Sequence, residues 1–184
     1  MKIVMVTGGV RSGKSAYAEK LTLEHSMVPS SNDRVLYVAT GMRYDNEMDM
    51  RIERHLQRRP SSWDTLEAPD ELSTAAYRGY GVILVDSLSA WIGNKLMAVP
   101  EERCRDVETT QFVQSQIREY LAELIQSEMV AVIIVTDEVG WGGVAMTPLG
   151  RWFQDVVGEV NQQLADQADE VIAVISGLPW RLKG

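Results

Sequence analysis

Five short apolar runs alternate with helix-like stretches along the 184-residue chain. The runs are continuous and bounded by charged or turn-forming residues, which is typical of parallel strands covered on both faces. They span residues 2–7, 35–39, 82–86, 130–136 and 170–176. The stretches between them predict helices over 13–25, 46–59, 88–97, 106–127 and 149–166, and a polar surface loop over 28–33. This alternation predicts a doubly wound α/β sheet, mostly parallel, with helices on both faces.

The turn after the first predicted strand carries a phosphate-binding motif. Gly8, Gly13, Lys14 and Ser15 follow the pattern G-x-x-x-x-G-K-[ST], and a helix-favouring stretch begins directly after it. In that setting the backbone N–H groups and the positive end of the helix bind phosphate, Lys14 reaches the β- and γ-phosphates, and Ser15 can ligate Mg²⁺. The predicted nucleoside triphosphate site includes Gly8, Gly9, Val10, Arg11, Ser12, Gly13, Lys14 and Ser15.

Asp86 ends the third apolar run. In P-loop proteins a carboxylate at such a strand end holds Mg²⁺. The alternative is that Asp86 only caps the next helix, a role that Ser87 could share. Because parallel strands bring their carboxyl ends to one edge of the sheet, beside the phosphates, we favour the metal role. The sequence thus predicts Ser15 and Asp86 as the Mg²⁺ ligands.

The segment 51–60 surrounds a histidine with arginines. On a helix, Arg51, His55 and either Arg58 or Arg59 share one face. Such a cluster can hold a triphosphate, and the positive charge favours neutral imidazole, the form that attacks phosphorus. The other interpretation is a solvated basic helix face, which periodicity alone favours.

Composition limits the partners and the compartment. The chain has 18 Lys and Arg against 26 Asp and Glu, a net charge of -8, which argues against nucleic acid as the main partner. The one cysteine, Cys104, cannot form an intramolecular disulfide, and no apolar stretch approaches the roughly 20 residues that span a bilayer. A buried-strand pattern follows Lys2 at once, so no signal peptide is expected. We expect one catalytic domain over residues 1–184 in the cytoplasm.

Six motifs are spread almost from end to end of the chain. They are the loop from Thr7 to Ser15, Tyr37-Val38-Ala39-Thr40, RIxxHxxxRPxxWxTxE over 51–67, Thr136-Asp137-Glu138-Val139-Gly140, Gly158-x-Val160-Asn161-Gln162, and Ala168-Asp169-Glu170-Val171 with Ser176-Gly177. With these motifs the chain resembles the adenosylcobinamide kinase/adenosylcobinamide-phosphate guanylyltransferase family. Many NTPases share the phosphate loop, whereas the segments 51–67 and 138–140 are much more specific. Together they favour His55 as a nucleophile over a solvated bystander.

The resemblance implies a bifunctional, trimeric enzyme of cobalamin nucleotide-loop assembly, built on a RecA-like P-loop sheet. Such an enzyme phosphorylates adenosylcobinamide with ATP or GTP. It then transfers GMP from GTP to that phosphate and releases pyrophosphate. By position, the catalytic residues would be Lys14 and His55, with His55 carrying the guanylyl group. The nucleotide would be surrounded by the phosphate loop and by Ala39, Thr40, Gly41, Leu56, Gln57, Arg58, Arg59, Glu67 and Asp86.

The chain departs from the family pattern after the fourth predicted strand. The family usually has Gly-x-Gly-Ile-Val-Pro where residues 140–145 read Gly-Trp-Gly-Gly-Val-Ala, and commonly an arginine where Gln154 stands. Two other functions stay open. One is a P-loop small-molecule kinase, which would not need His55, and the other is a RecA-like regulatory NTPase. Asp45, Glu47, Glu67 and Asp86 are the candidates for the base that deprotonates the acceptor hydroxyl.

Overall fold

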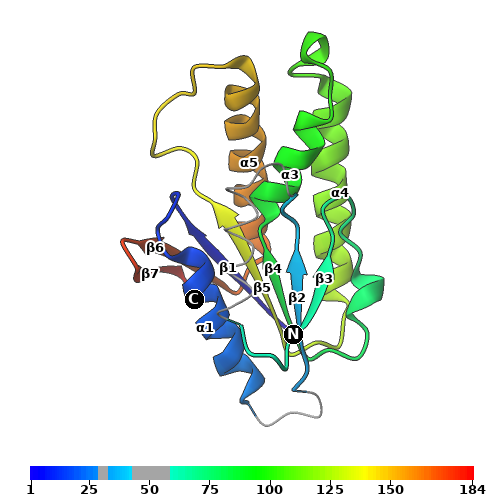
Figure 1. Cartoon of the computed structure of the whole chain (residues 1–184), viewed down its shortest axis with the longest axis vertical. Coiled ribbons are helices and arrows are strands. Elements are labelled where there is room, and N and C mark those ends of the chain that lie inside the picture. Colours follow the sequence, from blue (N-terminus) through cyan, green and yellow to red (C-terminus); the bar gives the residue numbers. More distant parts are fainter. Residues whose placement is uncertain (29–32, 43–58) are drawn as a thin grey trace.

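The computed structural model describes residues 1–28, 33–42 and 59–184, and in them seven strands form one sheet (Figure 1). The strands are β1 (Lys2–Gly8), β2 (Val35–Ala39), β3 (Asp64–Glu67), β4 (Val82–Asp86), β5 (Ala131–Asp137), β6 (Glu170–Ile175) and β7 (Leu178–Lys183). The helices are α1 (Lys14–Ser26), α3 (Leu88–Met97), α4 (Val107–Ile125) and α5 (Pro148–Gln167), with short 3-10 turns η1 (Thr74–Tyr77) and η2 (Glu101–Arg103).

The strand order is β3-β2-β4-β5-β1-β6-β7. All neighbours are parallel except β6 and β7, which form an antiparallel hairpin at one edge. The register pairs Gly8 with Asp137, and pairs Ala39 with both Asp86 and Glu67. The carboxyl edge of the sheet therefore carries the phosphate loop together with three strand-end carboxylates, those of Glu67, Asp86 and Asp137.

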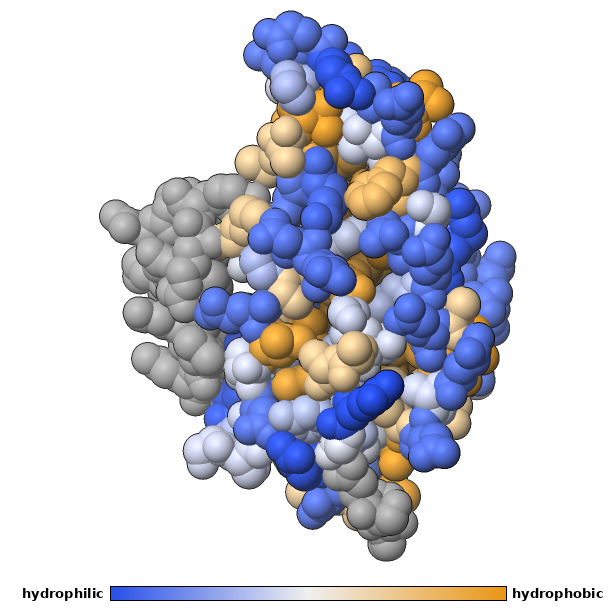
Figure 2. Space-filling view, turned by 90° about the vertical axis from the view of Figure 1, so that its right-hand side faces the viewer, coloured by the Kyte–Doolittle hydropathy of each residue, from blue (hydrophilic) through white to orange (hydrophobic). Residues whose placement is uncertain are grey.

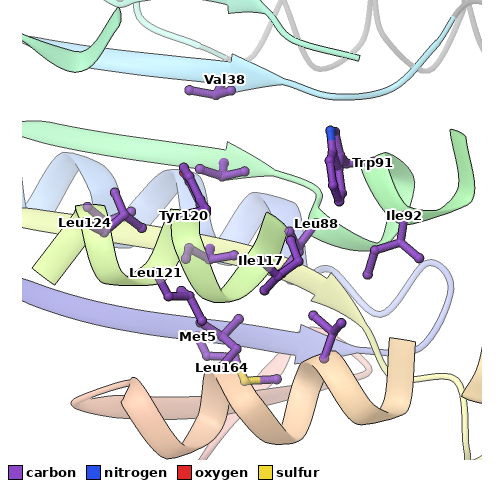
Figure 3. Packing of buried hydrophobic residues seen from close by; sticks show 14 of the residues in the cluster. Met5, Val38, Leu88, Trp91, Ile92, Ile117, Tyr120, Leu121, Leu124 and Leu164 are labelled. Carbon is purple, nitrogen blue, oxygen red and sulfur yellow. The ribbon is translucent and has the colours of Figure 1, made fainter. Parts of the chain in front are cut away.

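Side chains of each central strand point alternately to the two faces of the sheet, and both faces are buried. On one face, Val4 and Val6 of β1 pack with Ala18 of α1. On the other face, α3, α4 and α5 cover the sheet, and Met5 of β1 points towards Leu164 of α5 (Figures 1 and 3). Burial on both faces explains why the strands read as continuous apolar runs rather than as alternating ones.

Three helices begin at a residue whose side chain caps them. Ser87, Asp106 and Thr147 each accept a hydrogen bond from the backbone N–H three residues further on, at the start of α3, α4 and α5. α1 begins differently, because its N-cap is Gly13, which has no side chain and adopts a left-handed φ of 93°. The N-terminus of α1 thus keeps its backbone N–H groups for a ligand rather than for a capping side chain.

The predicted mostly parallel α/β sheet with helices on both faces is confirmed. The five predicted strands are present, and the helix predicted over 88–97 has the same bounds in the structure. β3 and β7, two edge strands that are mostly or wholly exposed, were not predicted. The helix predicted over 46–59 lies outside the described residues apart from Arg59, and so does most of the loop predicted over 28–33.

The face of the molecule seen in Figure 2 is largely hydrophilic. In Figure 2 hydrophilic side chains cover much of the visible face, and apolar ones gather only in small groups between them. No helix among the described residues has the length and apolar character that crossing a membrane requires.

Candidate nucleotide site

The phosphate loop curls tightly between β1 and α1. A Cβ on Gly8 would lie 2.5 Å from the backbone oxygen of Val174 and 2.6 Å from Oγ of Ser12. Gly13 faces the β6–β7 turn, where a Cβ would lie 3.3 Å from Cα of Gly177. The same turn is tied to the loop by a hydrogen bond from the N–H of Gly177 to the carbonyl of Ser12, 2.8 Å long. Space therefore requires glycine at position 8, and the left-handed φ of 93° favours glycine at position 13.

Lys14 lies over the loop. Its Nζ donates to the carbonyl of Gly9 at 3.3 Å and forms an ion pair with Oδ1 of Asp137 at 2.5 Å. The lysine side chain is 12% exposed and that of Asp137 is 30% exposed, so the cation is the better shielded partner of this pair. The structure thus places a partly buried cation at the phosphate loop.

Asp86 accepts hydrogen bonds from Ser15, at the end of the phosphate-loop motif, and from Tyr37 of β2. Oγ of Ser15 donates to its Oδ1 at 3.3 Å, and the hydroxyl of Tyr37 donates to its Oδ2 at 2.9 Å. Burial, and then the carboxylate of Asp86, raise the pKa of Tyr37 well above its ordinary value, so the phenol keeps the proton that it donates. Ser87, not Asp86, caps α3. The capping alternative for Asp86 is therefore excluded, and its carboxylate faces the predicted Mg²⁺ ligand Ser15.

Asp137 lies at the phosphate loop and was not among the predicted site residues. Besides its ion pair with Lys14, its Oδ2 accepts a hydrogen bond from Oγ of Ser89 at 2.7 Å. Asn161 of α5 donates to the carbonyl of Asp137 at 3.0 Å and accepts from Oγ1 of Thr136 at 2.7 Å. The sequence does contain a pattern that could have identified Asp137, because this residue ends an apolar strand in the same way as Asp86.

The other predicted nucleotide contacts that the structure describes lie around β2. Arg59 stacks on Tyr37, with its guanidinium carbon 3.3 Å from the ring centroid. Glu67 ends β3 directly beside Ala39. Thr40 is buried, and its Oγ1 accepts from the N–H of Ser87 at 2.9 Å, so its side chain positions the end of β4. Gly41 follows it along the chain, at the same edge of the sheet. His55, Leu56, Gln57 and Arg58 lie outside the described residues.

Gln154, where the family commonly has arginine, holds the loop that follows β5. Its Nε2 donates to the carbonyls of Val139 and Gly143 at 2.9 and 2.8 Å, and its Oε1 accepts from the N–H of Ala145 at 2.8 Å. One side chain thus joins three points of the loop that departs from the family pattern. The amide supplies both a donor and an acceptor, which an arginine cannot do.

A cavity of about 420 Å³ lies between α5 and the chain around the start of α4. It is lined by Arg105, Thr110, Trp152, Gln154, Asp155, Val156, Gly158, Glu159 and Gln162. No predicted nucleotide residue lines it. Across it, Arg105 and Asp155 form an exposed ion pair with an N–O distance of 2.8 Å.

A phosphate loop between the first strand and first helix of a parallel sheet, with a carboxylate at a nearby strand end, defines a P-loop nucleotide-binding protein. Residues 4–182 match the family model for cobinamide kinase / cobinamide phosphate guanyltransferase. The chain belongs to this family.

Curated relatives extend the match over nearly the whole chain. The bifunctional adenosylcobalamin biosynthesis protein CobU of Escherichia coli K12 is 38% identical, over 98% of this chain and 99% of the relative. CobU of Salmonella typhimurium LT2 is 36% identical over the same shares, and CobP of Pseudomonas aeruginosa PAO1 is 35% identical over 98% and 96%. Among solved structures, a KaiC-like protein from Pyrococcus horikoshii OT3 is 14% identical with a TM-score of 0.46, over 94% of this chain and 70% of that one.

Proposed function

We propose that this protein phosphorylates adenosylcobinamide with ATP or GTP and then transfers GMP from GTP to the product. The second step yields adenosylcobinamide-GDP and pyrophosphate. The observation that carries the proposal is the family match over residues 4–182 on a chain whose phosphate loop brings Lys14 and Ser15 beside strand-end carboxylates. A regulatory NTPase would not account for that match.

In the kinase step the acceptor hydroxyl displaces the nucleoside diphosphate from the γ-phosphorus. Such a reaction depends mainly on positioning and on neutralising charge. Lys14 supplies a fixed positive charge at the β- and γ-phosphates, and the N-terminus of α1 supplies backbone donors.

We infer that Ser15 and Asp86 hold Mg²⁺ with the nucleotide. A hydroxyl and a carboxylate 3.3 Å apart are the hard oxygen ligands that this ion takes, and phosphate oxygens complete such sites. The described residues contain no group of three or more His, Cys, Asp or Glu placed to hold a metal by themselves, which fits an ion that arrives with its nucleotide. When bound, Mg²⁺ neutralises phosphate charge.

In the guanylyl step we assign His55 as the nucleophile. An imidazole nitrogen attacks the α-phosphorus of GTP, forming an N–P bond as the bond to the β-phosphate breaks and pyrophosphate leaves. A phosphate oxygen of adenosylcobinamide phosphate then attacks the same phosphorus, and the N–P bond breaks. Arg59 supports this assignment, because it stacks on Tyr37, which itself contacts Asp86. His55 lies four positions before Arg59 in the chain, a separation that spans at most about 14 Å when extended.

Incubation with α-labelled GTP tests this assignment. The wild-type protein should acquire acid-labile, base-stable label, the stability of a phosphoramidate. His55→Ala should lose the label and guanylyl transfer while keeping at least part of its kinase activity, since γ-phosphoryl transfer needs no histidine nucleophile. His25→Ala is the matched control, because His25 lies in the last turn of α1 and should retain both activities.

Two results would contradict the proposal. Label of wild-type stoichiometry on the His55→Ala protein would exclude His55 as the acceptor. A wild-type protein that phosphorylates adenosylcobinamide but never acquires label would instead favour the small-molecule kinase.

We further infer one catalytic domain over residues 1–184, in the cytoplasm, which assembles into a homo-oligomer, the trimer expected for the family. The exposed strand β7 supports assembly, because Leu178, Trp180 and Leu182 alternate along it with side chains 71%, 60% and 52% exposed. An edge strand with a row of apolar side chains is a natural contact surface. Sedimentation equilibrium should give three times the chain mass, whereas a monomer at all concentrations would exclude assembly.

A further inference from the structure

Two strand-end carboxylates lie at the phosphate loop, and they have different partners. Asp86 contacts Ser15 and Tyr37. Asp137 contacts Lys14 and Ser89. Asp86 therefore lies next to Ser15, the predicted metal ligand, whereas Asp137 lies next to Lys14.

Asp137 is held by side chains of two helices, α3 and α5. Ser89, in the first turn of α3, donates to its Oδ2 and accepts from its backbone N–H at 3.2 Å. Asn161 of α5 holds its carbonyl. With the backbone and Oδ2 held in this way, Oδ1 is directed at Nζ of Lys14. Four lone-pair positions are available on a carboxylate, so these two bonds leave it able to accept another.

The position of Lys14 also locates Asp137 relative to substrate. The lysine of a phosphate loop reaches the β- and γ-phosphates. Oδ1 of Asp137 is 2.5 Å from this Nζ, so it lies beside the β- and γ-phosphate end that a bound triphosphate would present to Lys14. This is the end that an acceptor hydroxyl must approach to attack the γ-phosphorus in line.

We propose that Asp137 is the catalytic base of the kinase step. This inference rests on the proposed function. As the hydroxyl oxygen of the corrinoid forms its bond to the γ-phosphorus, Oδ1 of Asp137 accepts the hydroxyl proton. The bond between the γ-phosphorus and the bridging oxygen breaks, and the nucleoside diphosphate leaves. Asp137 then releases its proton to solvent. Ser89 is a positioning residue, because it acts through Asp137.

Only one of the two reactions needs such a base. An alcohol keeps its proton at neutral pH and must lose it during attack on phosphorus. The acceptor of the guanylyl step is a phosphate monoester, which is already ionised because its second pKa is about 6. Loss of Asp137 should therefore impair phosphorylation and spare guanylyl transfer.

The test uses Asp137→Asn, which keeps the shape of the side chain and removes its charge. The kinase kcat should fall by a factor of about 10² to 10⁴, the usual contribution of a general base. Guanylyl transfer from GTP to separately supplied adenosylcobinamide phosphate should proceed at the wild-type rate. ATP should bind at least as tightly as to wild type, since Lys14 no longer has an anionic partner. Asp155→Asn makes the same change in the exposed ion pair with Arg105 and should leave both rates unchanged.

A kinase kcat equal to wild type in Asp137→Asn would overturn the proposal. Equal losses in both reactions would also overturn it, because Asp137 would then only support Lys14. If Asp137→Asn does not fold, Ser89→Ala takes its place in the test and should lower the kinase kcat without lowering the rate of guanylyl transfer. An equal loss in both reactions, or no loss in either, would again refute the role of Asp137 as the base. Wild-type protein assayed in parallel separates the two hypotheses, because failure of the wild type to phosphorylate adenosylcobinamide would refute the proposed function itself.

Discussion

Replacing Tyr37 by phenylalanine tests whether the buried phenol holds Asp86 in its working position. Tyr37 is 3% exposed and donates a 2.9 Å hydrogen bond to Oδ2 of Asp86. The substitution keeps the ring, and with it the stacking of Arg59. It removes only the hydroxyl, so the carboxylate loses a donor without a change in shape.

The size of the effect follows from this one bond. A hydrogen bond to a charged group contributes about 1.5–3 kcal/mol. If the whole of that energy orients Asp86 in the transition state, turnover falls by about 10- to 150-fold, because each 1.36 kcal/mol corresponds to a factor of ten. We expect the loss in both half-reactions, since both use a nucleotide bound at Ser15 and Asp86.

The assay measures kcat for both half-reactions, together with urea denaturation. Tyr77→Phe is the matched control, because Tyr77 is also buried and its hydroxyl lies 2.9 Å from that of Tyr120, in the core. Burial raises the pKa of Tyr77 to about 12, so it is a neutral phenol like Tyr37. The control should lose about 1 kcal/mol of stability and keep wild-type turnover. Wild-type turnover in Tyr37→Phe, or an equal fall in the control, would refute the reasoning.

Three further predictions concern the loop, the metal ligand and acid stability. Lys14→Ala should weaken triphosphate binding in a direct titration and slow both half-reactions; unaltered kinase turnover would rule out the assigned loop. Asp86→Asn should cut turnover strongly and alter its Mg²⁺ dependence while melting like wild type; unchanged activity and metal dependence would disprove the metal role. The hydrogen bond from Lys2 lowers the pKa of Glu170 below its ordinary 4.5, so its stabilisation is present above that pH and lost as pH falls through the lowered pKa. Glu170→Gln should therefore lower the free energy of unfolding by about 0.5–1 kcal/mol at pH 7. The difference should shrink as pH falls through the lowered pKa, and a difference that does not shrink in acid would exclude this cause.

Several features could be read from the sequence because they depend on neighbouring residues. The phosphate loop needs glycines at two fixed positions, and the structure shows a close backbone approach at Gly8 and a left-handed φ at Gly13. The bounds of α3 follow from a serine cap and an apolar helical pattern. The buried strands were found because both of their faces are covered, which makes each one a continuous apolar run.

The edge strands and the second carboxylate were decided by tertiary structure. The side chains of β7 are exposed, so no apolar run marks the strand, and it exists through its pairing with β6. Asp137 was missed for a different reason, since its importance depends on β5 lying next to β1. Strand order places its carboxylate against Lys14, 123 positions away in the chain.

By itself, then, the sequence determined the nucleotide chemistry of the loop, because that chemistry resides in a short continuous segment. The tertiary structure decided that a second acidic side chain, Asp137, and a tyrosine, Tyr37, lie at that loop beside the predicted Asp86. Asp86, Asp137 and Tyr37 end or lie within three different strands, and only the register of the parallel sheet brings them to one edge. Local pattern cannot encode that neighbourhood, because it results from the packing of strands that are distant in sequence.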